Sequence, residues 1–196
     1  MAGHYGGNPY AWDGGTNAPH ISRYFIARGW VMPGETVIDA ACANGYGSHM
    51  IAQIAGKVYG LEVDEGCIQN ANADFAADNI EFRVHDIDKQ ELPDADVLIT
   101  IETAEHVQDL DHFLDQMWKH VKRCVIICVP LGGTSYAYTD EEKAGPAGEG
   151  NDFNNEAHVE ELFYKRGWKL QSNWRYGYSG MFVFFKVPPK RKKAKK

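Results

Sequence analysis

Strand-like and helix-like patterns alternate along most of this chain. Segments compatible with β-strands occur at Val37–Ala40, Lys57–Val63, Ile80–Val84, Asp96–Ile101, Val125–Val129, Lys169–Tyr176 and Met181–Val187. Helical patterns are interleaved with them, at Pro19–Gly29, Gly47–Ala55, Glu65–Ala77, Leu110–Val121 and Val159–Arg166. Such alternation is typical of a parallel sheet covered by helices. We therefore predict an α/β fold with a single doubly wound, mostly parallel seven-stranded sheet and an antiparallel C-terminal hairpin.

The length of 196 residues suffices for one such sheet with its helices, and not for two. We expect an N-terminal arm or lid at 1–18, one folded domain at 19–188 and a basic tail at 189–196. The polar, glycine-rich segment Gly132–Asn155 is too long for a simple connector, which makes it a candidate substrate lid.

Composition narrows the class of protein further. No apolar run has the length of a membrane span, and the first residues lack a signal-peptide core. The four cysteines show no C-x-x-C spacing, which is typical of buried thiols in a reducing compartment. We expect a cytoplasmic protein without a membrane span. Because the formal net charge is −7 despite the basic tail, nucleic acid is an unfavoured partner, although the tail keeps it open.

The most informative segment is Val37–Gly47, which reads VIDAACANGYG. A strand that runs into a turn of small residues and then a helix lets a ligand approach bare backbone N–H groups. Here a carboxylate, Asp39, precedes the turn, and the G-x-G-x-x-G pattern of dinucleotide-binding turns does not occur.

This segment resembles motif I of the class I S-adenosylmethionine-dependent methyltransferases, whose usual form is D-x-G-C-G-x-G-x-G. Four positions match and two glycines are replaced by alanine: the matches are Asp39, Cys42, Gly45 and Gly47, and the replacements are Ala41 and Ala43. Since alanine does not easily adopt a positive φ, we expect a slightly altered turn. The resemblance covers Ile21 to Val187 and implies a Rossmann-like methyltransferase fold, S-adenosyl-L-methionine as cofactor and S-adenosyl-L-homocysteine as product.

Further cofactor-binding residues follow in register. Glu62 comes about 20 residues after Asp39, the interval at which α/β nucleotide folds place a ribose-binding acid. Asp64 could instead take that role, but alternation along the strand favours Glu62.

The resemblance also implies that Asp86, after the third strand, contacts the adenine amino group. Asp86 and Asp88 could equally be ordinary loop acids. We also include Ile87, Ile101 and Arg23 in the cofactor-binding set, because Arg23 (with His20) falls where relatives often cover the amino-acid end of the cofactor.

The fourth strand opens into ETAEHV at 102–107, similar to the E-x-x-E-H segment of the ubiquinone-pathway-like O-methyltransferases. The resemblance implies an acceptor site made of Glu102, Glu105, His106 and, after the glycine-rich segment, His158. His106 is our candidate for the base, since imidazole titrates near neutral pH. Packing at a helix start is the alternative for His106. A divalent metal held by these four residues is possible but not favoured.

The acceptor is a small molecule or a sugar-like hydroxyl in our interpretation. The Asp/Asn-Pro-Pro-Tyr/Phe segment of amino-methylating DNA enzymes and the Pro-Cys dipeptide of cytosine-C5 enzymes are missing, which disfavours DNA bases. Two alternatives stay open: an RNA 2′-O-methyltransferase, and a protein that binds or consumes S-adenosylmethionine without transferring its methyl group.

Overall fold

The computed structural model describes residues 18–132 and 151–188. The predicted basic tail, nearly all of the predicted arm and the middle of the predicted lid lie outside the described residues. In the described part, no helix is long and apolar enough to cross a bilayer.

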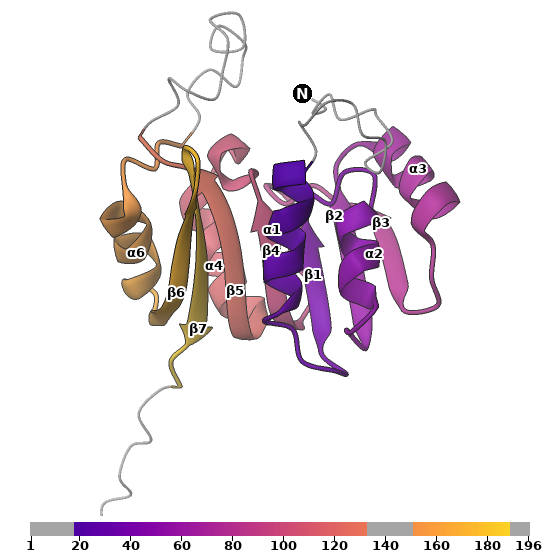
Figure 1. The fold of residues 1–196 in the computed structure, drawn as a ribbon, viewed down its shortest axis with the longest axis horizontal. Coiled ribbons are helices and arrows are strands. Elements are labelled where there is room, and N and C mark those ends of the chain that lie inside the picture. Colours follow the sequence, from indigo (N-terminus) through magenta and orange to yellow (C-terminus); the bar gives the residue numbers. More distant parts are fainter. Residues whose placement is uncertain (1–17, 133–150, 189–196) are drawn as a thin grey trace, which may run out of the picture.

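Helices and strands alternate as predicted, and all seven predicted strands form (Figure 1). The strands are β1 Thr36–Ala40, β2 Lys57–Glu62, β3 Ile80–Val84, β4 Ala95–Ile101, β5 Val121–Pro130, β6 Trp168–Tyr176 and β7 Ser179–Lys186. The helices are α1 Ala18–Arg28, α2 Tyr46–Ala52, α3 Glu65–Phe75, α4 Leu110–His120 and α6 Glu156–Tyr164, with a short 3₁₀ turn, η1, at Ala104–His106.

The strands form one sheet in the order β3-β2-β1-β4-β5-β7-β6. The first five strands are parallel, while β7 runs antiparallel between β5 and β6. This confirms the predicted fold class, a mostly parallel seven-stranded sheet with an antiparallel C-terminal hairpin.

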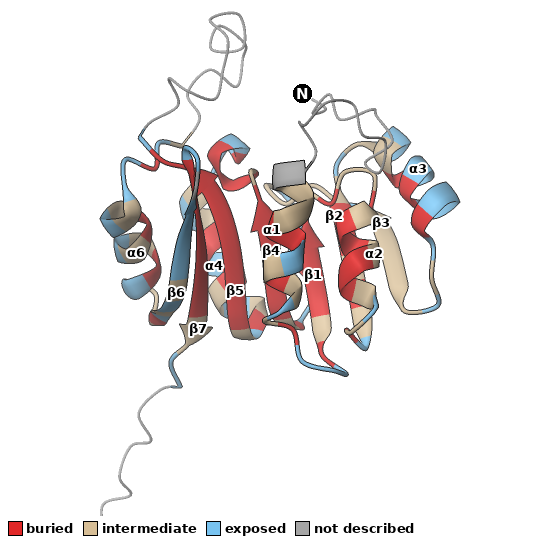
Figure 2. Cartoon of the chain, in the orientation of Figure 1, coloured by how far each residue is buried: buried red, intermediate tan, exposed pale blue. Residues whose placement is uncertain are grey.

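Two hydrophobic cores lie on opposite faces of the sheet. Because side chains alternate along a strand, Val37 joins the core under α1 and α2, whereas Ile38 joins the core under α4 and α6. Figure 2 shows the central strands almost wholly buried between these layers, and the edge strands β3 and β6 more exposed.

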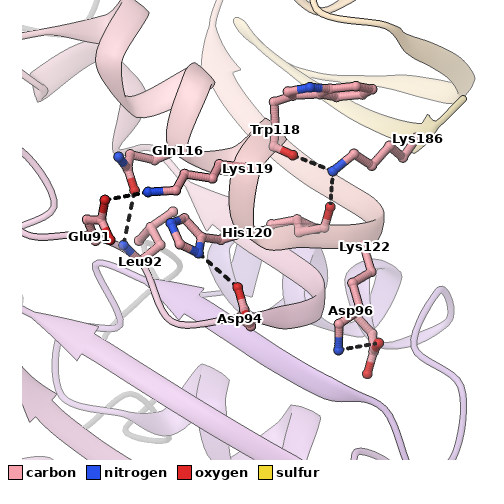
Figure 3. A network of polar contacts seen from close by, with 11 residues as sticks. Glu91, Leu92, Asp94, Asp96, Gln116, Trp118, Lys119, His120, Lys122 and Lys186 are labelled. Atoms are coloured by element: carbon pink, nitrogen blue, oxygen red, sulfur yellow. Dashed lines mark hydrogen bonds and ion pairs between the residues drawn. The ribbon is translucent and has the colours of Figure 1, made fainter. Parts of the chain in front are cut away.

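The boundary that differs most from the prediction is the start of β5, which lies at Val121 rather than Val125, directly after α4. The Lys186 ammonium donates to the carbonyl oxygens of Trp118 and Val121, which the end of α4 leaves without helical partners (Figure 3). His120 Nδ1 also pairs with Asp94 Oδ1 at 2.9 Å. These contacts hold α4 at the amino ends of β4 and β5.

The site-forming edge is the opposite one. The chain passes from β1 to β2 and β3 on one side, and then returns to β4 on the other side of β1. In open α/β sheets, ligands bind at such a switch point, outside the carboxyl ends of the strands. The segments that follow β1, β2, β3 and β4 all meet at this edge.

Candidate cofactor and acceptor site

The turn after β1 adopts left-handed backbone at both alanines, with φ 61° at Ala41 and 47° at Ala43. Gly45, at φ 85°, then precedes the first residue of α2. The turn is fixed by hydrogen bonds from Cys42 N to Leu61 O and from Gly45 N to Cys42 O, each 3.0 Å long. The alanines therefore accept the left-handed backbone that we expected them to avoid, at a cost of about 1–2 kcal/mol each.

The two glycines of the turn are also required by packing. A Cβ on Gly47 would lie 2.1 Å from the ring of Tyr24, and one on Gly45 would lie 2.7 Å from both Ala71 and Phe82. Their missing side chains let α1 and α3 approach the start of α2. Gly45 and Gly47 thus shape the site through close contact between elements.

Asp39 is fully buried beneath this turn. The Tyr24 hydroxyl donates to its Oδ1 at 3.0 Å, and Ser48 donates to its Oδ2 at 2.6 Å. Burial raises the pKa of Asp39 to about 6, while the two hydroxyl donors oppose that rise. Asp39 therefore joins β1 to α1 and α2, and sequence reasoning missed both of these hydroxyl partners.

Glu62 ends β2 beside the turn, and three backbone N–H groups hold its carboxylate. Ala43 N donates to Oε2 at 3.1 Å, while Val63 N and Asp64 N donate to Oε1 at 2.8 and 3.1 Å. A carboxylate has about four acceptor positions. Glu62 is thus oriented in advance and keeps acceptor capacity for a ligand.

Asp64, two residues after Glu62, caps a helix instead. The Asp64 side chain caps α3 by accepting from Cys67 N at 2.9 Å. Glu62, and not Asp64, is therefore the carboxylate that contacts the turn.

Asp86 lies just after β3, where its carboxylate accepts from Asp88 N at 3.0 Å and from Lys89 Nζ at 2.6 Å. The hydrogen bond from Lys89 holds the pKa of Asp86 below its usual value. Asp88 in turn accepts from Gln108 N at 2.9 Å. Between the two acids, Ile87 packs against the core under α4.

At the end of β4, Ile101 is buried and Glu102 adopts a positive φ of 52°. Glu102 Oε1 lies 3.5 Å from Arg23 Nη1 and accepts from Cys128 Sγ at 3.2 Å. Arg23 also donates to Ser179 Oγ at 3.4 Å. A left-handed, non-glycine residue at the switch point stores strain of about 1–3 kcal/mol, which is typical of functional sites.

The η1 turn carries Glu105 and His106, which differ sharply in exposure. Only 2% of the Glu105 side chain is exposed, against 54% for His106, and 3.9 Å separates Glu105 Oε1 from His106 Nε2. Burial, and then the charge of Glu102, raise the pKa of Glu105 to about 8. Such a shift places a carboxyl group within reach of proton transfer at neutral pH.

The η1 turn is held by Asn151, a residue that sequence reasoning missed. It donates one backbone and two side-chain hydrogen bonds to carbonyl groups of the turn and of Val107. No local sequence signal separates Asn151 from the neighbouring Asn154 and Asn155. Its role depends on contacts with residues far away in the chain.

His158 lies in the first turn of α6, where its N–H donates to the capping side chain of Asn155 and its ring faces Phe153. Among residues 18–132 and 151–188, no group of three or more His, Cys, Asp or Glu side chains could hold a metal ion. The four predicted acceptor residues thus do not form a metal-ligand set in this structure.

Comparison with known proteins shows which family this chain belongs to. A family model described as "Methyltransferase domain" matches residues 32–162. This chain belongs to that methyltransferase family. The match runs from β1 to α6 and so includes the motif I turn, Glu62 and the η1 turn.

Two curated relatives carry the same assignment. A probable S-adenosylmethionine-dependent methyltransferase of Mycolicibacterium smegmatis is 31% identical over 88 residues, which is 44% of this chain and 34% of that protein. One of Mycobacterium tuberculosis is 29% identical over 80 residues, 40% of this chain and 28% of that protein. The match therefore spans about a third or less of these relatives.

Solved methyltransferases share the fold of this one. Magnesium protoporphyrin IX methyltransferase from Synechocystis with bound S-adenosylhomocysteine gives a TM-score of 0.71 at 17% identity, over 87% of this chain and 84% of that one. A Haloferax volcanii methyltransferase, in complex with the Trm112 activator, gives 0.70 at 18% identity, over 85% and 88%. The curated relatives are named for S-adenosylmethionine and the Synechocystis structure holds S-adenosylhomocysteine, which supports the predicted cofactor.

Proposed function

We propose that this protein transfers the methyl group of S-adenosylmethionine to a hydroxyl group on a small molecule or a sugar-like acceptor. The observation that carries the proposal is the Glu62 carboxylate, oriented by the Ala43 N–H at 3.1 Å at the switch point of the sheet. A carboxylate held in this way accepts hydrogen bonds from both hydroxyls of a ribose.

The remaining cofactor roles follow the chain around this edge. We assign the amino-acid end of the cofactor to the turn at Ala41 and Ala43 and to Arg23, whose guanidinium lies 3.5 Å from Glu102 Oε1 at the end of β4. The adenine end is assigned to Asp86 and Ile87, which follow β3. Asp39, Gly45 and Gly47 act from beneath, since they hold the turn in shape.

The acceptor is assigned to the other side of the switch point, where Glu102, Glu105 and His106 follow β4, with His158 entering from α6. When bound, S-adenosylmethionine supplies a methyl carbon already activated on a sulfonium, so alignment is the main requirement. As the acceptor oxygen bonds to that carbon and the carbon–sulfur bond breaks, His106 takes up the hydroxyl proton. The exposed imidazole then releases the proton to water.

The test combines binding with turnover. Calorimetry should detect binding of S-adenosylmethionine and S-adenosylhomocysteine to the wild-type protein. A screen of hydroxyl-bearing acceptors with radiolabelled methyl donor should then detect transfer that His106→Ala reduces by about 10²–10⁴-fold. The proposal fails if neither cofactor form binds. Transfer only to amines or thiols would correct the acceptor class.

A further inference from the structure

Asn151 donates hydrogen bonds to three carbonyl groups, two in the η1 turn and one on Val107 directly after it. Its backbone N–H donates to Glu105 O at 2.9 Å, and its side-chain Nδ2 donates to Ala104 O at 3.0 Å and to Val107 O at 2.8 Å. Two of these carbonyls belong to the η1 turn and the third to Val107, the residue that follows it, and so short a turn cannot satisfy them by itself. One residue, 44 positions later in the chain than Val107, thus determines the shape of the turn.

The side chain that this turn keeps buried is that of Glu105. Its Oε2 is buried and accepts no hydrogen bond within the part of the chain that the structure describes. Charged and titratable groups face it from each element packed around it: Arg23 on α1, Glu102 after β4, His106 on η1 and Cys128 on β5.

We propose that Asn151 is a positioning residue of the acceptor site, which keeps the Glu105 carboxyl buried behind His106 so that its carboxylate orients and stabilises the imidazole when the imidazole is protonated. This inference rests on the proposed function of His106. It adds a buried partner for the base, and a remote residue that fixes the geometry of the pair.

The cost of burying the Glu105 carboxyl group explains why the turn needs the hydrogen bonds from Asn151. An unpaired buried carboxyl group is unfavourable, and the turn would relieve that cost by rotating Glu105 toward water. The turn is a single 3₁₀ turn with little resistance of its own. Three hydrogen bonds from Asn151 oppose the rotation. Because burial is the main cause of the raised pKa of Glu105, loosening the turn should bring that pKa down toward its ordinary value.

The chain contains a matched control. Asn79 Nδ2 also donates to two carbonyl groups, Ala52 O at 2.8 Å and Ala55 O at 2.9 Å. Asn79 precedes β3 at the amino end of the sheet, so it lies at the edge opposite the site. Asn79→Ala removes the same kind of contact as Asn151→Ala without touching the η1 turn.

The experiment compares the two variants by a ¹³C NMR titration of the Glu105 carboxyl in the protein without cofactor. The wild-type protein and Asn79→Ala should titrate near pH 8, whereas Asn151→Ala should titrate at least one pH unit lower. In steady-state assays, Asn151→Ala should lower kcat at least tenfold while the KM for S-adenosylmethionine changes less than twofold. Asn151→Leu, close in size but without side-chain N–H donors or charge, should behave like Asn151→Ala and serves if the alanine variant does not fold.

The two levels of the proposal fail separately. A Glu105 titration that is the same in Asn151→Ala, Asn79→Ala and the wild-type protein overturns the role of Asn151, whatever the activity. An equal loss of kcat in both asparagine variants reduces Asn151 to a structural residue and also overturns it. If no acceptor is methylated while the titration shifts as expected, the proposed function fails. The inference that Asn151 keeps Glu105 buried then still holds.

Discussion

Ala43 and Glu62 are joined by a hydrogen bond from the Ala43 N–H to Glu62 Oε2, 3.1 Å long. The donor lies in the turn after β1 and the acceptor ends β2, so this bond connects the two segments that would hold the ribose and amino-acid ends of the cofactor. Ala43 makes this bond from left-handed backbone, with a φ of 47°.

Removing the Glu62 carboxylate should weaken cofactor binding. Glu62→Ala should lose about 1.5–3 kcal/mol of binding free energy, roughly ten- to a hundred-fold in Kd, since it removes charge-assisted hydrogen bonds. Calorimetry with S-adenosylhomocysteine measures this. Glu81→Ala, on the exposed β3 edge where Glu81 pairs with Lys57 and Arg83, is the control and should bind normally. Equal affinity in the two variants would remove Glu62 from the ribose role.

Glu105→Gln should stabilise the fold at alkaline pH. The pKa of the Glu105 carboxyl is raised to about 8, so the folded state holds a proton that the unfolded state releases near pH 4.5. Stability of the wild-type protein should therefore fall as pH rises between these values, by up to about 1.4 kcal/mol per pH unit, and level off above pH 8. Urea unfolding from pH 5 to 9 should show this slope in the wild-type protein and its absence in Glu105→Gln. Parallel curves for the two proteins would contradict it.

The pH dependence of kcat should show the same group. If the Glu105 carboxylate supports protonated His106, kcat rises with pH through the Glu105 pKa of about 8. The rise should disappear in Glu105→Gln, whose kcat should stay near the low-pH value of the wild-type protein, because glutamine, like the protonated carboxyl group, carries no charge. A rate profile that keeps its rise in this variant assigns the titration to another group.

Two substitutions at left-handed positions of the turn, Ala43→Gly and Gly45→Ala, should change the stability of the fold in opposite directions. Ala43→Gly relieves backbone strain at φ 47° and should raise stability by up to about 1 kcal/mol, since glycine's greater unfolded-state entropy offsets part of the gain. Gly45→Ala places a Cβ 2.7 Å from Ala71 and Phe82 and should destabilise by several times that amount, about 2–4 kcal/mol. Denaturant midpoints measure both. Stabilisation by Gly45→Ala would show that the turn relaxes freely.

Chelation separates base catalysis from metal catalysis. We expect methyl transfer to survive excess chelator and to be lost in His106→Ala, because the proposed base is the His106 imidazole. The assay is a chelator titration followed by return of Mg²⁺ or Zn²⁺. Activity that vanishes with chelator and returns with either cation would show that a metal takes part.

The sequence alone was enough to predict the strand–helix alternation, the turn after the first strand and the place of Glu62 on the second strand. These features are local: the period of apolar residues specifies each strand, and the order of small residues specifies the turn. Asp39 and Glu62 lie on the two strands of one strand–helix–strand unit. Their separation in the sequence was therefore enough to place Glu62 near the turn. The alanines in the turn were harder to interpret, because the hydrogen bonds that keep them at positive φ come from neighbouring segments, such as Leu61 O.

Only the tertiary structure decided the environment of each acceptor residue. The E-x-x-E-H spacing treats Glu102 and Glu105 alike, yet Glu102 pairs with Arg23 while Glu105 is buried. The contacts of Asn151 with the η1 turn were likewise visible only in the tertiary structure. Burial and long-range hydrogen bonds depend on which elements the sheet order brings together, and α1, β5 and the residues before α6 contribute from distant parts of the chain. Those contacts set the pKa and orientation of a side chain, whereas local sequence sets only its identity and position.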